Sequence, residues 1–349
     1  MARPVAALLS FRLGGSDGVA VEATKWAGAL GVLGFDVRTV AGEGPVDRLV
    51  PGLAIDAAEP PPPAAVQEAL EDADLVVVEN LCSLPLNPRA STVVAEVLGN
   101  RRAVLHHHDL PWQREAYAGY PPPPDDPAWV HVTVNDLSRR ELAAVGIAAT
   151  VVRNAFDVDA PGGDRHAPRA ALGVDAGTRL VLQPTRAIPR KNIPGAIALA
   201  EALGAVFWLL GPAEDGFGPE LDRLVARARC PCVLGAGALG GAGRVVDAYA
   251  ASDVVVLGST WEGFGNPAIE SAVYRRPLAI GPYPVAAELA SFGFRWFAHD
   301  DPAAVSSFLD EPDTALLEHN HRVAREHFAL RDLPGRIGRV FEAAGWVFR

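Results

Sequence analysis

The sequence has little cysteine and no long hydrophobic run, and each shortage excludes a class of protein. Three cysteines provide no disulfide framework, so we expect a reducing, cytoplasmic location. Cys230 and Cys232 lack the second cysteine pair of a typical zinc site, which favours ordinary thiols. Every apolar run falls short of the roughly 20 residues that a membrane span requires. "PVAALLSF" lacks the basic flank and cleavage pattern of a signal peptide, so we interpret it as a buried strand.

Positive charge is also scarce. The formal net charge is −11, which argues against nucleic acid as a partner. Residues 1–157 carry 12 Lys+Arg against 20 Asp+Glu, so we expect repulsion from anionic membranes and a soluble acceptor for any reaction. Lys25 and Lys191 are the only lysines among the 31 basic residues. Each lysine is therefore a candidate for a role that requires a compact point charge; Lys25, on the first predicted helix, is expected to tolerate substitution.

Short apolar runs alternate with helical patterns along the whole chain, which predicts parallel α/β sheets. The predicted strands are "VAALLSF", "DVRTVAG", "DLVVVEN", "RAVLHHHD", "VHVTVND", "ATVVRNA", "RLVLQPT", "AVFWLLG", "CVLGAG", "DVVVLGS" and "PLAIGP". The polar tract rich in Pro and Gly at residues 157–178 predicts an interdomain linker. Because open parallel sheets bind ligands at the carboxyl ends of their strands, the residues after each run are the candidates for chemistry.

Two carboxylates flank a glycine-rich turn in "WEGFGNPAIE", after the run "DVVVLGST". Such a turn before a helix places backbone N–H groups and the positive end of a helix dipole beside a ligand, which suits a phosphate. Glu262 and Glu270 at this site are suited to holding hydroxyl groups.

Two other glycine-rich segments are weaker signals. Gly14, Gly15 and Gly18 follow the first strand, where a ligand approach and a plain tight turn are about equally supported. Gly235, Gly237 and Gly240 in "GAGALGGAG" match the dinucleotide fingerprint by spacing. An oxidoreductase hypothesis would use this loop for NAD, with Glu262 on a ribose.

Polar clusters follow two further strands. His106, His107, His108 and Asp109 end one strand, and because side chains alternate in direction, at most two histidines face one site. A metal would need more ligands, so contact with substrate is favoured over a metal centre, and structural histidines stay an alternative. Arg186 and Lys191 in "PTRAIPRKNI" combine a planar fork and a point charge, which suits a diphosphate.

Together these segments resemble the retaining GT-B glycosyltransferases, the large family that includes sucrose synthases and bacterial phosphatidylinositol mannosyltransferases. The resemblance covers nearly the whole chain, and it is most specific in the spacings of Glu262 to Glu270 and of Arg186 to Lys191. It implies two Rossmann-like parallel-sheet domains facing across a cleft. Residues 1–157 would take the acceptor and residues 158–334 the nucleotide sugar, and a helix at residues 335–349 would pack back toward the first domain.

The resemblance also implies roles for individual residues. The implied catalytic residues are Arg186, Lys191, Glu262 and His108. The implied donor-binding residues are Gly15, Gly237, Leu239, Gly263, Phe264, Gly265, Asn266 and Glu270. The implied acceptor-binding residues are Asp17, Glu79, Asn80 and Asp109, and the segments Ser16 to Gly18 and Glu79 to Pro88 are expected to shape that pocket.

The implied reaction moves a sugar from a UDP- or GDP-sugar to a hydroxyl of a soluble small molecule or glycan, without a cofactor. Attack on the front face retains the anomeric configuration, and Arg186 and Lys191 replace a metal in stabilising the leaving phosphate. "DAD" at Asp72 and "DVD" at Asp157 match an Asp-x-Asp metal motif by letter, and we interpret both as chance. The alternatives are a nucleotide-sugar epimerase on the same fold and, less favoured, the NAD-dependent oxidoreductase or an exported ligand-binding protein.

Overall fold

The structure is a computed structural model that describes residues 2–15, 17–240 and 244–348. The chain divides into two compact units. Unit 1 comprises Met1–Ala155 and Leu330–Arg349, and unit 2 comprises Phe156–Ala329. The chain passes between units within a few residues of the expected boundaries after residues 157 and 334.

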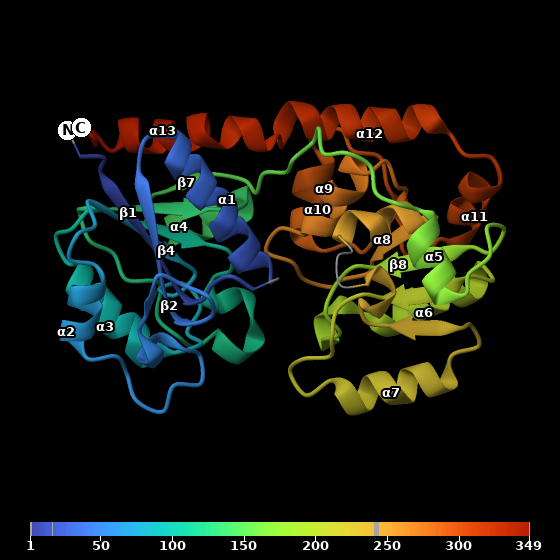
Figure 1. Cartoon of the computed structure of the whole chain (residues 1–349), viewed down its shortest axis with the longest axis horizontal. Helices are drawn as coiled ribbons and strands as arrows, with labels where there is room; N and C mark the ends of the chain where they lie inside the picture. Colours follow the sequence, from blue (N-terminus) through green and yellow to red (C-terminus); the bar gives the residue numbers. More distant parts are fainter. Residues whose placement is uncertain (1, 16, 241–243, 349) are drawn as a thin grey trace. The chain divides into compact units, whose positions relative to one another are not determined.

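Unit 1 contains a seven-stranded parallel sheet in the order β3-β2-β1-β4-β5-β6-β7 (Figure 1). Its strands are β1 Val5–Arg12, β2 Asp36–Glu43, β3 Arg48–Leu49, β4 Leu75–Glu79, β5 Ala103–His107, β6 Trp129–Thr133 and β7 Ala149–Val151. Its helices are α1 Gly18–Val32, α2 Pro63–Ala69, α3 Pro88–Leu98, α4 Asp136–Ala144 and α13 Leu333–Ala343.

Unit 2 contains a six-stranded parallel sheet in the order β10-β9-β8-β11-β12-β13. Its strands are β8 Leu180–Gln183, β9 Val206–Leu209, β10 Cys232–Leu234, β11 Val254–Leu257, β12 Leu278–Ile280 and β13 Phe297–Ala298. Its helices are α5 His166–Leu172, α6 Ile193–Ala202, α7 Gly218–Arg227, α8 Val245–Ala251, α9 Asn266–Val273, α10 Pro284–Ala290, α11 Pro302–Asp310 and α12 Thr314–His327. The predicted fold class, with two Rossmann-like parallel sheets, is confirmed.

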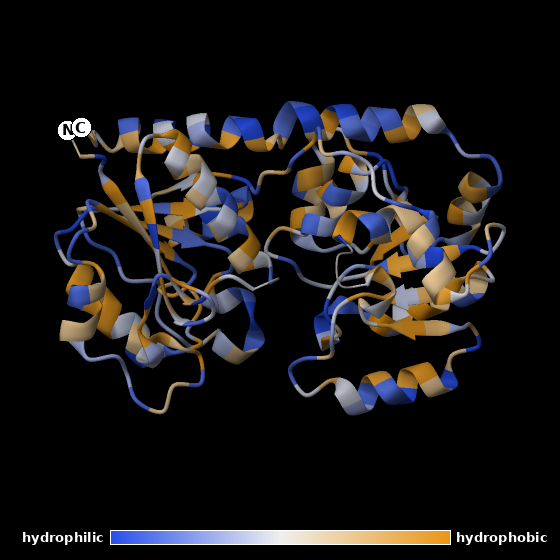
Figure 2. Cartoon of the chain, viewed as in Figure 1, coloured by the Kyte–Doolittle hydropathy of each residue, from blue (hydrophilic) through white to orange (hydrophobic). Residues whose placement is uncertain are grey.

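Helices cover both faces of each sheet, and this explains why the strands are apolar throughout rather than alternating. In β1, Ala6 and Leu8 pack into one core of unit 1 with α1 and α13, whereas Ala7 and Leu9 pack into a second core with α2 and α3. Helix α13 contributes Leu333, Ile337, Val340 and Phe341 to the first core, at the spacing of one helical face. Figure 2 accordingly shows mostly hydrophobic strands, while α12 is largely hydrophilic.

All eleven predicted strands are present, but the sequence did not reveal β3 or β13. Each of these strands has two residues and ends its sheet, so neither could show a periodic pattern. The prediction that residues 157–178 form a linker is wrong in part, because His166–Leu172 form helix α5 within unit 2. The Pro and Gly residues around α5 concealed this short helix.

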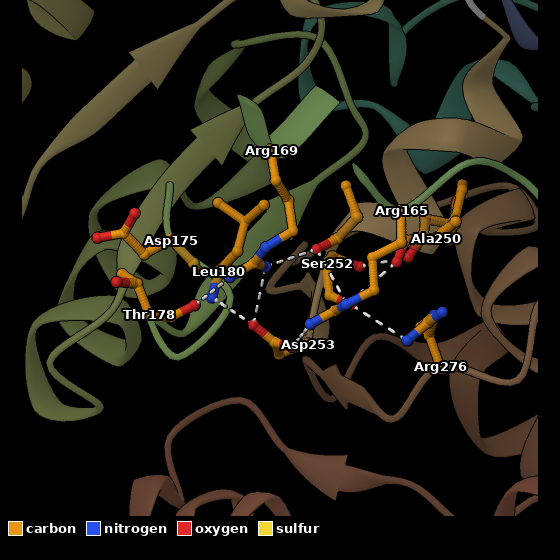
Figure 3. Close-up of polar contacts among 11 residues, drawn as sticks. Arg165, Arg169, Asp175, Thr178, Leu180, Ala250, Ser252, Asp253 and Arg276 are labelled. Atoms are coloured by element: carbon orange, nitrogen blue, oxygen red, sulfur yellow. Dashed lines mark hydrogen bonds and ion pairs between the residues drawn. The ribbon is translucent and has the colours of Figure 1, made fainter. Parts of the chain in front are cut away.

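A buried arginine fixes α5 to the sheet (Figure 3). Arg169 is 4% exposed, and its guanidinium donates to the backbone oxygens of Ala251, Asp175 and Thr178 and to the Asp253 carboxylate. Asp253 also accepts from Arg165 and from the backbone N–H of Leu180, the first residue of β8. Helix α5, in the segment that was predicted to be a linker, therefore positions β8 and β11, the two strands between which the strand order of unit 2 reverses.

We predict that Arg169→Met lowers the free energy of unfolding of unit 2 by about 3 kcal/mol, because it removes one partner of a buried ion pair and leaves several carbonyl groups unpaired. Urea denaturation at pH 7 measures this loss. Arg223→Met is the control, since Arg223 pairs with Glu220 with 65% of its side chain exposed. Equal stability of the Arg169→Met and Arg223→Met proteins would contradict this role for Arg169.

Candidate functional site

The strand order of unit 2 reverses between β8 and β11, and ligands of open α/β sheets bind beside such a point. The loops after these strands bring Lys191 and Glu262, separated by 71 residues, into a buried ion pair. Lys191 is 7% exposed and Glu262 6%. The pair joins two residues that sequence analysis had placed in the same site but had not connected.

The Glu262 carboxylate accepts two further hydrogen bonds. Arg190 donates from Nη1 to Glu262 Oε2 at 2.8 Å and to the Trp261 carbonyl at 2.7 Å, and the Ser259 hydroxyl donates to Oε1 at 2.5 Å. Arg190 is a site residue that sequence analysis missed, although it adjoins Lys191. One carboxylate thus lies against two cations, so the cluster carries a net positive charge.

Burial and charge act in opposite directions on these groups. Burial alone would raise the pKa of Glu262, but Lys191 and Arg190 outweigh it and lower that pKa to about 2. Burial lowers the pKa of Lys191, and the Glu262 carboxylate offsets that effect only in part. A cation in such surroundings interacts strongly with any anion that reaches it.

Backbone contacts hold the two loops together. The Thr260 N–H donates to the Arg190 carbonyl at 2.9 Å. The buried amide of Gln183, at the end of β8, donates to the Lys191 carbonyl at 2.9 Å. Asn192 has a left-handed backbone, φ 50°, and its side chain accepts from the Gly195 N–H at the start of α6. The Lys191 loop is therefore attached to β8, to α6 and to the Glu262 loop.

The turn before α9 requires a glycine at one position. Gly265 has φ +95°, and a Cβ there would lie 2.1 Å from Tyr283 Oη. Phe264 is 5% exposed and stacks with Phe156 at 6.3 Å between ring centroids. Gly263, Phe264 and Gly265 thus lead into the amino end of α9 at Asn266, whose helix dipole favours a negative ligand.

Glu270 lies one turn further along α9. Its Oε2 accepts a hydrogen bond from the hydroxyl of Tyr249 on α8 at 2.5 Å. Tyr249 is fully buried, and no sequence motif had pointed to it.

Three other residues that were predicted to contact the donor lie in the loops after β8 and β10. Arg186 pairs with Glu214 at 2.5 Å, and about a third of each side chain is exposed, so Arg186 does not share the Glu262 carboxylate. Gly237 and Leu239 form a 3-10 turn, Gly237–Leu239. These placements leave the predicted roles of all three residues as predictions.

The structure does not match the dinucleotide fingerprint at Gly235, Gly237 and Gly240. The preceding strand, β10, ends the sheet rather than bordering the point of strand reversal, and α8 begins only at Val245. The fingerprint requires a helix that opens within the motif at that point. The last part of the run, residues 241–243, lies outside the described residues.

In unit 1, the strand order reverses between β1 and β4, and a buried carboxylate lies just after that point. Glu79 Oε2 lies 2.9 Å from His106 Nδ1 and 2.8 Å from His108 Nε2. His107 faces the opposite way, toward Ser83 and His131, as the predicted alternation requires. Two of the three histidines therefore share one site, and His108 is one of them.

The pKa values of His106 and His108 shift in opposite directions beside Glu79. Burial would raise the pKa of Glu79, but the two histidines lower it to about 2. Burial lowers the pKa of His106, whereas for His108 the hydrogen bond and charge of Glu79 outweigh burial and raise it. The three side chains have ligand atoms within 4.8 Å of one another, a grouping that also suits a metal ion. The predicted lack of a metal therefore stays a prediction.

The remaining predicted acceptor residues border this cluster or cap a helix. Asn80 has φ 61°, and its side-chain oxygen accepts from the backbone N–H groups of His108 and Asp109. Asp109 pairs with Arg114 at 2.6 Å. Asp17 caps α1 and pairs with Arg12, while Gly15 is exposed in the preceding turn. The predicted Ser16 lies outside the described residues.

The expectation that Lys25 tolerates substitution stays a prediction, although the structure places this lysine in a partly buried ion pair. Its side chain is 16% exposed and pairs with Glu22, a carboxylate that is 1% exposed. Burial raises the pKa of Glu22, and Lys25 opposes that shift.

Within the described residues, no helix combines the length and the apolarity needed to cross a membrane.

Comparison with known proteins gives related enzymes, although no protein-family model matches the chain. Mannosylglucosylglycerate synthase of Thermotoga maritima is 26% identical over 332 residues, which cover 78% of this chain and 77% of that protein. D-inositol 3-phosphate glycosyltransferase of Mycolicibacterium gilvum is 32% identical over 183 residues, which cover 48% of this chain and 39% of that protein.

Solved structures share the fold at low identity. Anabaena Alr3699/HepE in complex with UDP-glucose has a TM-score of 0.71 and 18% identity, with 97% of this chain and 99% of that chain covered. Sucrose-phosphate synthase from Thermosynechococcus elongatus has a TM-score of 0.71 and 15% identity, with 98% and 99% covered.

The lowered pKa of Glu262 predicts a loss of stability in acid. A carboxylate with a depressed folded-state pKa stabilises the protein above its unfolded-state pKa, and that contribution disappears as the pH falls toward the folded-state value. With a pKa of about 2 instead of 4.5, Glu262 should contribute about 2 kcal/mol less at pH 3 than at pH 5.

We therefore expect Glu262→Gln to be less stable than wild type at pH 7, with a difference that shrinks toward pH 3. Urea denaturation at pH 3, 5 and 7 measures it. Glu311→Gln, at an exposed position after α11, should follow the wild-type pH dependence. A Glu262→Gln protein with the full wild-type acid sensitivity would contradict the assigned ion pair.

Proposed function

The chain belongs to the retaining GT-B glycosyltransferases, and we propose that it moves a hexose from a UDP- or GDP-sugar to a hydroxyl of a small soluble acceptor, without a metal ion. Unit 2 would bind the nucleotide sugar and unit 1 the acceptor. The activities for which the related enzymes are named support transfer of a sugar as the reaction.

The observation that carries the proposal is the cluster of Lys191, Arg190 and Glu262 beside the strand reversal of unit 2. A nucleoside diphosphate brings two phosphate groups that need cations, and two cations are held here by one buried carboxylate. The diphosphate would share Lys191 and Arg190 with Glu262. Arg186, on the same loop, would release Glu214 and bind the diphosphate. Arg190 is thus a further candidate for the role first assigned to Arg186.

The carboxylates and the α9 turn support binding of the rest of the donor. Glu270 would accept hydrogen bonds from the ribose hydroxyls, and the turn at Gly237 and Leu239 would line the base. Glu262 and the turn from Gly263 to Asn266 would hold the sugar. A structural neighbour, Alr3699/HepE, was solved with UDP-glucose, which favours a uridine nucleotide among the donors considered.

In unit 1, His108 would contact the transferred sugar from the acceptor side. Glu79 orients His108 through its Nε2 and raises the pKa of that histidine, so Glu79 is a positioning residue for that contact. Asn80, Asp109 and Asp17 are proposed acceptor contacts. The excess of acidic residues in residues 1–157 supports a soluble acceptor rather than an anionic lipid.

The proposed reaction breaks the bond between the anomeric carbon and the phosphate oxygen and forms a bond from that carbon to the acceptor oxygen on the same face. The acceptor proton passes to the leaving phosphate oxygen. Lys191 and Arg190 stabilise the negative charge that develops on the diphosphate, a contribution that typically changes rates by about 10²–10³-fold. These two cations supply the stabilisation that a divalent metal ion supplies in other transferases.

We predict that transfer proceeds in excess EDTA and retains the anomeric configuration of the donor. Incubation with UDP-glucose or GDP-mannose, with glucosylglycerate and inositol 3-phosphate as acceptors suggested by the relatives' names, gives products whose anomeric protons are resolved by NMR. Activity with and without EDTA should agree within about twofold, because Lys191 and Arg190 provide the cationic stabilisation.

Loss of activity on chelation that manganese restores would contradict the metal-independent mechanism and favour Glu79, His106 and His108 as ligands. Inversion at the anomeric carbon would contradict the front-face reaction. Conversion of the donor sugar to its epimer in the absence of any acceptor would instead support the epimerase alternative.

A further inference from the structure

Helix α8 supplies a buried hydroxyl that none of the roles above uses. Tyr249 is 0% exposed, and its hydroxyl donates to Glu270 Oε2 at 2.5 Å. The ring of Tyr274 packs against Tyr249 with 5.0 Å between centroids. The phenol side chain of Tyr249 is apolar apart from its hydroxyl. That single polar group donates its hydrogen bond to one carboxylate oxygen of Glu270 on the neighbouring helix, α9.

We propose that Tyr249 is a positioning residue that fixes the Glu270 carboxylate in the orientation required to accept hydrogen bonds from the two ribose hydroxyls of the donor. This inference rests on the proposed function, which assigns Glu270 to the ribose. Tyr249 itself would not touch the nucleotide.

The conformational freedom of glutamate is the physical reason for such a residue. A glutamate side chain has three torsion angles, and the last one, about the bond to the carboxylate, is broad and weakly restrained. A hydrogen bond to one oxygen restrains that rotation and therefore sets the direction of the other oxygen. Ordering the side chain before the ligand arrives removes an entropic cost from binding.

The hydroxyl is suited to this task because it stays protonated. Burial, and then the charge of Glu270, raise the pKa of Tyr249 well above its usual value. The phenol therefore remains a donor across the working range of pH, and a donor is the partner that a carboxylate needs. The resulting charge-assisted bond is stronger than a bond between neutral groups.

The chain offers a matched control. Tyr274 lies beside Tyr249, and burial, followed by the charge of Glu270, raises the pKa of its hydroxyl to about 12. The hydrogen bond that Tyr274 donates to Glu270 runs from its backbone N–H to the Glu270 carbonyl, and Tyr274→Phe leaves that bond intact. Tyr249→Phe and Tyr274→Phe each remove one hydroxyl from the same aromatic pair and keep both rings. Only the first should change how Glu270 is held.

The test compares UDP with 2′,3′-dideoxy-UDP, and in parallel GDP with 2′,3′-dideoxy-GDP, by calorimetry on the full-length protein. The series with the tighter parent nucleotide is used. The ratio of the two dissociation constants reports recognition of the ribose hydroxyls, and a general weakening of the site affects both ligands and cancels in the ratio. We expect Tyr249→Phe to lower the wild-type ratio about 10-fold, since one charge-assisted hydrogen bond is lost. Tyr274→Phe should keep the ratio, and Glu270→Gln should reduce it furthest.

The outcomes separate this inference from the proposed function. If Glu270→Gln reduces the ratio but Tyr249→Phe leaves it at the wild-type value, the role of Tyr249 is wrong and the assignment of Glu270 stands. If the wild-type protein does not distinguish the nucleotides, or if Glu270→Gln keeps the full ratio, Glu270 does not hold the ribose, and both the assignment and the inference fail. Equal losses in the two tyrosine variants would also overturn the inference, because they would show an effect of packing.

Discussion

The buried ion pair of Lys191 and Glu262 is the constraint on which the candidate site of unit 2 depends. Removing two charges from water costs several kcal/mol for each ion, so a pair of this kind persists only where further hydrogen bonds satisfy its members. Arg190 and Ser259 provide those bonds to Glu262. Loss of either partner would leave a charge buried without its counterion. The loop after β8 and the loop after β11 must therefore hold their positions together.

This coupling links the fold to the chemistry proposed for it. The β8 and β11 strands meet where the strand order reverses, and Asp253, held by Arg165 and Arg169, joins the first residue of β8 to the start of β11. At the opposite ends of the same strands lie the cations. The hydrogen bonds of Asp253 thus fix the amino ends of β8 and β11. The loops that follow the carboxyl ends of these strands carry Lys191 and Glu262.

The sequence was sufficient to predict every strand except the two-residue β3 and β13, because runs such as "DLVVVEN" are apolar on both faces, as central parallel strands must be. It also pointed to Lys191 and Glu262 as members of one site. It could not show that they pair, because contacts across 71 residues depend on how the loops fold. Arg190 was missed because Arg186 matched the family spacing, and Tyr249 because a tyrosine in a helix resembles any core residue. Helix α5 was missed because Pro and Gly surround it, although Arg169, an arginine 4% exposed, attaches it firmly to the sheet.

The two lysines make the central claim, that Lys191 binds the donor diphosphate, directly measurable. Protein labelled with ¹³C at lysine gives two sets of side-chain NMR signals, and a Lys25→Arg variant assigns them. At saturating UDP or GDP, whichever binds more tightly, the account predicts a large shift of the Lys191 signals near the ammonium group and little change at Lys25. Lys191 signals that stay in place while the nucleotide demonstrably binds would contradict the account and move the phosphate site to another loop.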